Sequence, residues 1–318
     1  MIEIIKAAQV THLLGAKLKI DDDKRQIQFS IPAYIEKCIE ELACSDGILR
    51  AVETPLIEKP TMITHPKPLD RESPLRFVYQ RVNEQLLYVA GKARSDITFA
   101  VALCSRKSSA PVEDDLKSVK KISRYLHGKE NYTITYSCGT IRGAPLGWSD
   151  ASYTTPGKCD GKSTTGWVFK MAGGVFFWNS KKQLVVTLSS CETELIAMNS
   201  AARELVWIRA LLEEIRYEPL KVILYGNNEG ALALSKHSSF HQRSEHINVA
   251  FQCIRQLVKK GWLTLTGVPT TEMAADELTM PLGKIDFRRF LKLLGISNDV
   301  ANSREGFSER RYRPASIE

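Results

Sequence analysis

Between residues 222 and 231 the chain reads Val222-Ile223-Leu224-Tyr225-Gly226-Asn227-Asn228-Glu229-Gly230-Ala231. The first half is an apolar run typical of a buried strand, and the second half is a polar turn that leads into a helix. A metal ligand would sit at the end of that strand, where this chain has Asn227. An amide lacks the negative charge that Mg²⁺ sites need, so this position bears on whether the chain is an enzyme.

The pattern on both sides of this stretch predicts a mixed sheet. Strands are expected over 146–152, 165–170, 175–178, 222–226 and 262–268, and helices over 190–215, 229–236, 245–260 and 272–279. Three neighbouring strands, then helix, strand, helices, strand and helix, indicate an α/β domain with a mixed five-stranded sheet. A doubly wound nucleotide-binding fold fits less well, because no Gly-x-Gly-x-x-Gly follows a strand.

The first 140 residues read as smaller pieces. Residues 13–30 alternate as a β-hairpin, and Asp21-Asp22-Asp23 lie in its turn. Aspartates are common in solvated turns, so this explanation is preferred to a metal or polymerase site. A helix is expected over 31–42, and the apolar periodicity from Tyr79 to Leu126 predicts two packed helices.

Breaks in composition predict the domain limits. Five prolines between Pro55 and Pro74 indicate a linker, and a glycine-rich break lies around residues 139–145. The expected parts are a segment 1–56, a linker 57–78, a helical region 79–140, the α/β domain 141–280, a helix 281–297 and a flexible tail 298–318.

Composition indicates a globular protein with a basic surface. The 318 residues are 43% apolar and 25% charged, with a formal net charge of +8 and a pI near 9.0. This charge suits a polyanionic partner, although a soluble basic surface explains it equally well. The seven cysteines show no Cys-x₂-Cys spacing, so reduced thiols are expected. Without a signal peptide or membrane span, we expect a soluble protein of the cytoplasm or nucleus, and the oligomeric state stays open.

Asp150 lies within the first strand of the α/β domain, between apolar neighbours. An unpaired carboxylate is unfavourable when buried. Either a cation or hydroxyl groups bind Asp150 or the strand end is exposed, and the first explanation is favoured.

The long helix carries two glutamates whose roles can be separated. Ser189-Ser190-Cys191-Glu192 fits a capping box, so Glu192 has a structural explanation. Glu194 instead begins a core-facing stripe at helical spacing, which continues through Met198, Ala201, Leu205, Ile208, Leu212 and Ile215. Glu194 is therefore the expected partner of Asp150.

Asp276 opens the last short helix of the domain. An aspartate early in a helix favours the macrodipole and often means no more than that, so only its company makes Asp276 a candidate.

Other polar groups have weaker claims. His237, His241 and His246 are expected to be loop residues near phosphate more than zinc ligands. Lys162-Ser163-Thr164 and Ser180-Lys181-Lys182 place cations and hydroxyls at strand ends. The strands contain Trp148, Trp167 and Trp178. These side chains are expected to pack in the core more than to stack on nucleic-acid bases.

Taken together and in order, these motifs resemble the reverse transcriptase–RNase H region of a copia-type LTR retrotransposon Pol polyprotein. The resemblance runs from about Leu13 to Gly295. The motifs are Leu14-Gly15, Thr54-Pro55-Leu56, Leu86-Leu87-Tyr88, Arg94-Ser95-Asp96-Ile97, Arg124-Tyr125-Leu126, Ser149-Asp150-Ala151, Lys162-Ser163-Thr164-Thr165-Gly166, Trp178-Asn179-Ser180-Lys181-Lys182-Gln183, Leu188-Ser189-Ser190 with Glu192 and Glu194, Glu245-His246-Ile247, and Ala275-Asp276-Glu277-Leu278-Thr279 with Pro281-Leu282.

The resemblance implies an RNase H-like mixed five-stranded sheet flanked by helices, preceded by a partial reverse transcriptase thumb and connection region. The family cleaves the RNA strand of RNA–DNA hybrids with four carboxylates and two divalent ions, Mg²⁺ or Mn²⁺. Of the four catalytic positions, the first is Asp150, the second is Glu194 and the fourth is Asp276, and these three would bind metal. The third is Asn227, where the family has aspartate.

Further departures from the family point toward lost activity. Ser152 and Asn248 stand where the family usually has aspartate, and Met280 stands where it has lysine. The Tyr-x-Asp-Asp polymerase signature is absent, so no DNA synthesis is expected from this fragment. The sequence predicts an RNase H-like nuclease that binds an RNA–DNA hybrid or other nucleic acid and is impaired at Asn227. The alternative is a non-catalytic relic or a nucleic-acid-binding module.

Overall fold

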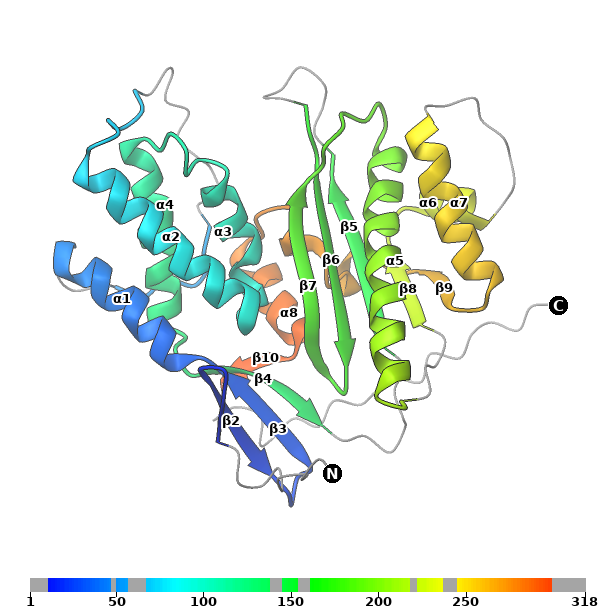
Figure 1. Ribbon diagram of the computed structural model, residues 1–318, viewed down its shortest axis with the longest axis horizontal. Coiled ribbons are helices and arrows are strands. Elements are labelled where there is room, and N and C mark those ends of the chain that lie inside the picture. The colour runs from blue at the N-terminus through cyan, green and yellow to red at the C-terminus, as the bar shows by residue number, and fades with distance from the viewer. Residues whose placement is uncertain are drawn as a thin grey trace.

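Two five-stranded sheets organise the chain in the computed structural model (Figure 1). The structure describes residues 11–46, 50–56, 67–137, 145–153, 161–217, 222–236 and 245–298. The predicted tail lies outside these residues except for residue 298, and residues 57–66 of the predicted linker lie outside them too. Within the described residues, no helix is long and apolar enough to cross a membrane.

The central sheet has the strand order β7-β6-β5-β8-β9. Its strands are β5 (Leu146–Ser152), β6 (Thr164–Met171), β7 (Gly174–Lys182), β8 (Val222–Gly226) and β9 (Leu263–Gly267). β6 runs antiparallel to its neighbours β5 and β7, whereas β5, β8 and β9 are parallel. This arrangement confirms the predicted RNase H-like mixed sheet of five strands.

Helices cover one face of this sheet. They are α5 (Ser190–Glu214), which packs on β5 and β6, and α6 (Glu229–Lys236) and α7 (Glu245–Lys259) beyond it. The predicted stripe of α5 is buried from Met198 to Leu212, together with Trp167 and Phe169 of the sheet. The prediction was wrong for Ile215, whose side chain is 65% exposed, because α5 ends at Glu214 and Ile215 lies beyond the last turn.

The N-terminal hairpin belongs to the second sheet, which has the order β1-β2-β3-β4-β10. The strands are β1 (His12–Leu13), β2 (Ala16–Asp21), β3 (Gln26–Ser30), β4 (Tyr132–Ser137) and β10 (Ile296–Asn298). The hairpin was predicted, and Asp21 accepts a hydrogen bond from the Lys24 amide in its turn. β4 and β10 were not predicted, and they join residues far apart in the sequence.

Four α-helices and a 3₁₀ turn form the helical region. They are α1 (Pro32–Asp46), α2 (Pro74–Lys92), η2 (Ser95–Ile97), α3 (Thr98–Ser105) and α4 (Glu113–His127). Of these, α3 and the 3₁₀ turn contact β7 of the central sheet, and α1 packs on α2 and α4. Figure 1 shows α2, α3 and α4 on the opposite side of the central sheet from α5. The prediction of two helices between Tyr79 and Leu126 was wrong, because the backbone leaves the helical conformation at Arg94 and again before α4.

A single hydrophobic cluster joins this helical region to the central sheet. It combines Val89 and Ala90 of α2 with Trp148 of β5, and α8 (Lys284–Leu294) contributes Phe287. Trp178 of β7 donates its indole N–H to the carbonyl oxygen of Ala90 at 3.0 Å. The tryptophans of the sheet therefore serve packing, as expected, while the predicted domain limits stay predictions.

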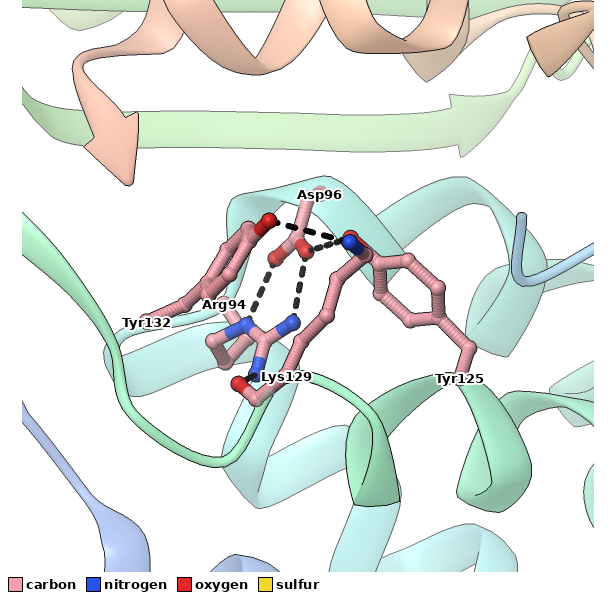
Figure 2. Close-up of polar contacts among 5 residues, drawn as sticks. All are labelled: Arg94, Asp96, Tyr125, Lys129 and Tyr132. Atoms are coloured by element: carbon pink, nitrogen blue, oxygen red, sulfur yellow. Dashed lines mark hydrogen bonds and ion pairs between the residues drawn. The ribbon is translucent and has the colours of Figure 1, made fainter. Parts of the chain in front are cut away.

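A buried ion pair occupies the break between α2 and α3 (Figure 2). Arg94 donates from Nε and Nη2 to the two carboxylate oxygens of Asp96 at 2.9 and 2.8 Å, and the Tyr125 hydroxyl donates to the same carboxylate at 2.5 Å. The third guanidinium nitrogen donates to the Lys129 carbonyl oxygen at 3.0 Å. All three guanidinium nitrogens of Arg94 and both carboxylate oxygens of Asp96 therefore have a hydrogen-bond partner inside the chain.

Candidate active site

Asp150 and Asn227 meet at one end of the central sheet because of strand register. β5 and β8 are parallel, and Trp148 pairs with Tyr225. Two residues further along, Asp150 and Asn227 lie beside each other, and the Asn227 amide donates from Nδ2 to Oδ1 of Asp150 at 3.4 Å. Asp150 is only 4% exposed, so the explanation by an exposed strand end is excluded.

Asp276 reaches the same place on a short turn after β9. The predicted helix over 272–279 is instead two 3₁₀ turns, η3 (Thr270–Glu272) and η4 (Asp276–Leu278). The extended backbone of Met273 separates them, and η4 packs against β5 and β6. The buried hydroxyl of Thr279, just after η4, donates to Oδ2 of Asp150.

Glu194 approaches from α5, as the helical stripe predicted. Its side chain is 6% exposed, and its Oε2 has no hydrogen-bond partner among the described residues. Glu192 behaves differently: its Oε2 accepts from the Leu188 amide at 3.0 Å, and the Ser189 hydroxyl accepts from the Glu192 amide at 3.3 Å. Glu192 therefore secures the start of α5, and Glu194 is left for the site.

Burial raises the pKa of all three carboxyl groups, and the charge of Asp150 adds to the shift of the other two. Burial, followed by the charge of Asp150, raises the pKa of Glu194 to about 9. The same two causes raise the pKa of Asp276 to about 7. Burial also raises the pKa of Asp150, although hydrogen bonds from Thr279, Ala151 and Asn227 oppose it. No basic side chain contributes to any of these shifts, so the cluster has an excess of potential negative charge.

This donor set fits divalent cations in chemical type. Mg²⁺ and Mn²⁺ prefer carboxylate oxygens, and a cation would satisfy the buried Oε2 of Glu194 and offset the repulsion. The fit is incomplete, because Asn227 supplies no charge and its amide and Thr279 already engage both oxygens of Asp150. Within the described residues, no group of three or more His, Cys, Asp and Glu side chains is spaced to hold an ion.

Cationic and hydroxyl side chains lie at the same end of the sheet as Asp150. Thr164 begins β6 opposite Ser152, and it pairs on its other side with Lys182. Lys181, the residue before Lys182, is exposed. Arg106 at the end of α3 donates to the Thr164 hydroxyl at 3.2 Å. The predicted strand-end groups therefore lie at the same sheet end as Asp150, and Arg106 joins them from the helical region.

The structure also shows residues that the sequence did not reveal. Thr279 bonds to Asp150, and Gly166 lies against the turn at Leu278 and Thr279; both contacts join segments more than 100 residues apart, which no local pattern signals. Asn228 caps α6, since its Oδ1 accepts from the Ala231 amide at 2.9 Å. The side chains of His237, His241, His246 and Asn248 lie outside the described residues.

Similar sequences occur in transposons. The chain is 30% identical over 294 residues to the retrovirus-related Pol polyprotein from transposon TNT 1-94 of Nicotiana tabacum, covering 90% of this chain and 22% of the relative. It is 33% identical over 220 residues to the retrovirus-related Pol polyprotein from transposon RE1 of Arabidopsis thaliana, covering 69% of this chain and 15% of the relative. The chain thus spans less than a quarter of either relative's length. No model of a protein family matches it.

Two solved structures are similar at lower identity. LC11-RNase H1 in complex with an RNA/DNA hybrid is 15% identical, with a TM-score of 0.33 over 42% of this chain and 93% of that chain. The foamy viral protease-reverse transcriptase in complex with dsDNA is 11% identical, with a TM-score of 0.47 over 81% of this chain and 44% of that chain. The fold class itself follows from the order and direction of the strands.

Proposed function

Because the chain is homologous over most of its length to a segment of the retrovirus-related Pol polyproteins of copia-like transposons, we propose that its RNase H-like domain binds RNA–DNA hybrids and cleaves the RNA strand weakly or not at all. The observation that carries this proposal is the meeting of Asp150, Glu194 and Asp276 without any basic partner. Buried acids of this kind are typical of a functional site.

Each residue has a definite task in this proposal. Asp150, Glu194 and Asp276 are the side chains that would hold Mg²⁺ or Mn²⁺, after moving closer together than their spacing here. Such ions would supply activation of the attacking water and stabilisation of the leaving oxygen. Thr279 orients Asp150, and the second turn of α5 carries Glu194. Lys181 and Lys182 lie at the same sheet end, where they suit the phosphates of a nucleic acid.

Asn227 is the reason to expect impaired cleavage. It lies beside Asp150 at the position where the family has its third carboxylate. Its amide donates a hydrogen bond to Asp150, so it competes for an oxygen that would bind metal. Replacing an anionic ligand by an amide also removes one charge from a site that must hold two dications. The same observation favours the second candidate, a nucleic-acid-binding module without nuclease activity.

Cleavage of a labelled RNA–DNA hybrid distinguishes these candidates. We expect Asn227→Asp to cleave about 100-fold faster than wild type or more in Mg²⁺, since even partners outside the direct ligands cost about 10–100-fold. Asn227→Asp combined with Asp150→Asn is the control and should be inactive. Wild type that cleaves in Mg²⁺ as fast as Asn227→Asp would show that the site is not impaired.

Binding is measured with the same hybrid in Ca²⁺, without cleavage. Hybrid binding by a wild type that cuts in neither Mg²⁺ nor Mn²⁺ would support the binding module. Failure of Asn227→Asp to cut in either ion would contradict the proposal that this one residue limits a nuclease.

A further inference from the structure

Gly166 lies directly opposite Asp150 in the antiparallel pairing of β5 and β6. The turn that carries Asp276 rests on this glycine. A Cβ atom at residue 166 would lie 2.7 Å from Cβ of Leu278, 2.7 Å from Cγ2 of Thr279 and 3.1 Å from the carbonyl oxygen of Ala275. Two of these contacts are shorter than real Cβ contacts, and one of the three atoms is backbone, so the turn would have to move.

Thr279 ties the same turn to Asp150 through its hydroxyl. Besides the hydrogen bond to Asp150, the hydroxyl oxygen lies 2.9 Å from the carbonyl oxygen of Asp276. A hydroxyl has one hydrogen to donate, and an ionised carboxylate is a stronger acceptor than a carbonyl. When Asp150 is ionised, the hydroxyl therefore links β5 to the turn that bears Asp276.

The rest of the turn is closed by its own backbone. The amides of Thr279 and Met280 both donate to the Asp276 carbonyl oxygen, at 3.0 and 3.1 Å. The neighbouring Glu277 is buried, and its Oε2 accepts from the Leu282 amide at 2.9 Å. The turn is thus a compact unit. The distance between the turn and β6 therefore sets the position of Asp276.

We propose that Gly166 and Thr279 are positioning residues that together fix Asp276 beside Asp150, Gly166 by leaving room for the turn and Thr279 by bonding it to the strand. Asp150 and Asp276 come from segments joined by no other described side-chain hydrogen bond at this point. Their separation therefore depends on this docking. The part of the inference that concerns metal affinity rests on the proposed function, whereas the docking of the turn does not.

Two measurements on the full chain test the inference. The first is hydrogen exchange at the Thr279 and Met280 amides without metal, relative to the β8 amides as a measure of global opening. The second is the dissociation constant for Mn²⁺. The variants are Gly166→Ala, Thr279→Val, which keeps the shape, and Thr279→Ser, which keeps the hydroxyl. Gly91→Ala is the matched control, because a Cβ there would meet nothing within 4 Å, and Thr98→Val removes a hydroxyl that has no partner among the described residues.

We expect Gly166→Ala and Thr279→Val to speed exchange at the two turn amides by about 10-fold or more beyond any change at β8, a local opening. Mn²⁺ binding should weaken by about 10-fold, as for other partners that orient metal ligands. Thr279→Ser and both controls should stay near wild type in both measurements.

An unchanged exchange rate of the turn amides in Gly166→Ala and Thr279→Val would overturn the inference. Faster exchange in Thr279→Ser but not in Thr279→Val would overturn it as well. If wild type binds no Mn²⁺, the exchange data decide alone. Absence of hybrid cleavage would weigh against the proposed function and leave the exchange result standing.

Discussion

The chain buries acidic side chains in two places, and it treats them in opposite ways. Asp96 receives two hydrogen bonds from Arg94 and one from Tyr125, so its charge is balanced within the protein (Figure 2). Asp150 and Glu194 are also buried, yet the charge that acts on Glu194 is that of another acid, Asp150. One oxygen of Glu194 has no partner among the described residues.

This difference distinguishes a buried acid that stabilises the fold from buried acids that a bound cation would stabilise. A buried charge is tolerated when a partner of opposite charge satisfies it, and it is unfavourable when none does. Asp96 therefore needs nothing from outside the chain. The carboxylates at the end of β5 would gain most from a cation, which is why they mark the candidate site.

The largest effect is expected from removing the partner of Asp96. Arg94→Met should lower the free energy of unfolding by about 3–5 kcal/mol, because it leaves a buried carboxylate without its cation. Urea denaturation measures the change. Arg289→Met is the control, because Arg289 pairs with Asp286 at 3.0 Å with both side chains well exposed, and such pairs contribute about 0–1 kcal/mol. Equal losses of unfolding free energy in the two variants would contradict the claim that the ion pair of Arg94 and Asp96 stabilises the fold.

A change of opposite sign is expected at the carboxylate cluster. The pKa of Glu194 is raised from 4.5 to about 9 and that of Asp276 from 3.8 to about 7. The folded state therefore holds protons that the unfolded state releases, and stability present below about pH 4 is lost as the pH rises toward 9. Glu194→Gln removes one of these groups, so it should raise the free energy of unfolding at pH 8 by about 1–3 kcal/mol.

The measurement is urea denaturation of the metal-free chain at pH 5 and pH 8. Glu192→Gln is the matched control on the same helix, and it should not gain stability, because Glu192 accepts from the Leu188 amide. Added Mn²⁺ should stabilise wild type more at pH 8 than at pH 5, and Glu194→Gln should reduce that gain. A Glu194→Gln chain with the wild-type dependence on pH would show that Glu194 is not strained by burial beside Asp150.

Local patterns in the sequence were enough to nominate the acids of the site. Asp150 was nominated by its apolar strand, and Glu194 by its place on the buried stripe of α5. The role of Asn227, and most of the case for Asp276, came from the resemblance. The structure shows Asn227 beside Asp150 and places Glu194 and Asp276 close enough for the Asp150 charge to raise both pKa values.

The groups that hold these acids could not be read from sequence, because they depend on pairings between distant segments. Gly166 matters only because β6 places it opposite Asp150 and under η4. Arg94 and Asp96 lie in a known motif, but their burial depends on α4, which supplies Tyr125. Similarly, β10 pairs with β4 across more than 150 residues, and a three-residue strand has no pattern of its own.

The smallest effect is expected at the cap of α5. Glu192, which has a hydrogen-bond partner, lies there two residues before Glu194, whose Oε2 has none among the described residues. Ser189→Ala removes the oxygen that accepts from the Glu192 amide, and it should lower the free energy of unfolding by about 1 kcal/mol. Ser190→Ala is the control, because Ser190 is the exposed next residue and not the cap. Glu194 lies in the second turn, where backbone hydrogen bonds hold it, so Mn²⁺ affinity should change little. Equal losses from both serines would mean that the cap contributes nothing specific, and a large loss of Mn²⁺ affinity would mean that Glu192 and Glu194 act together.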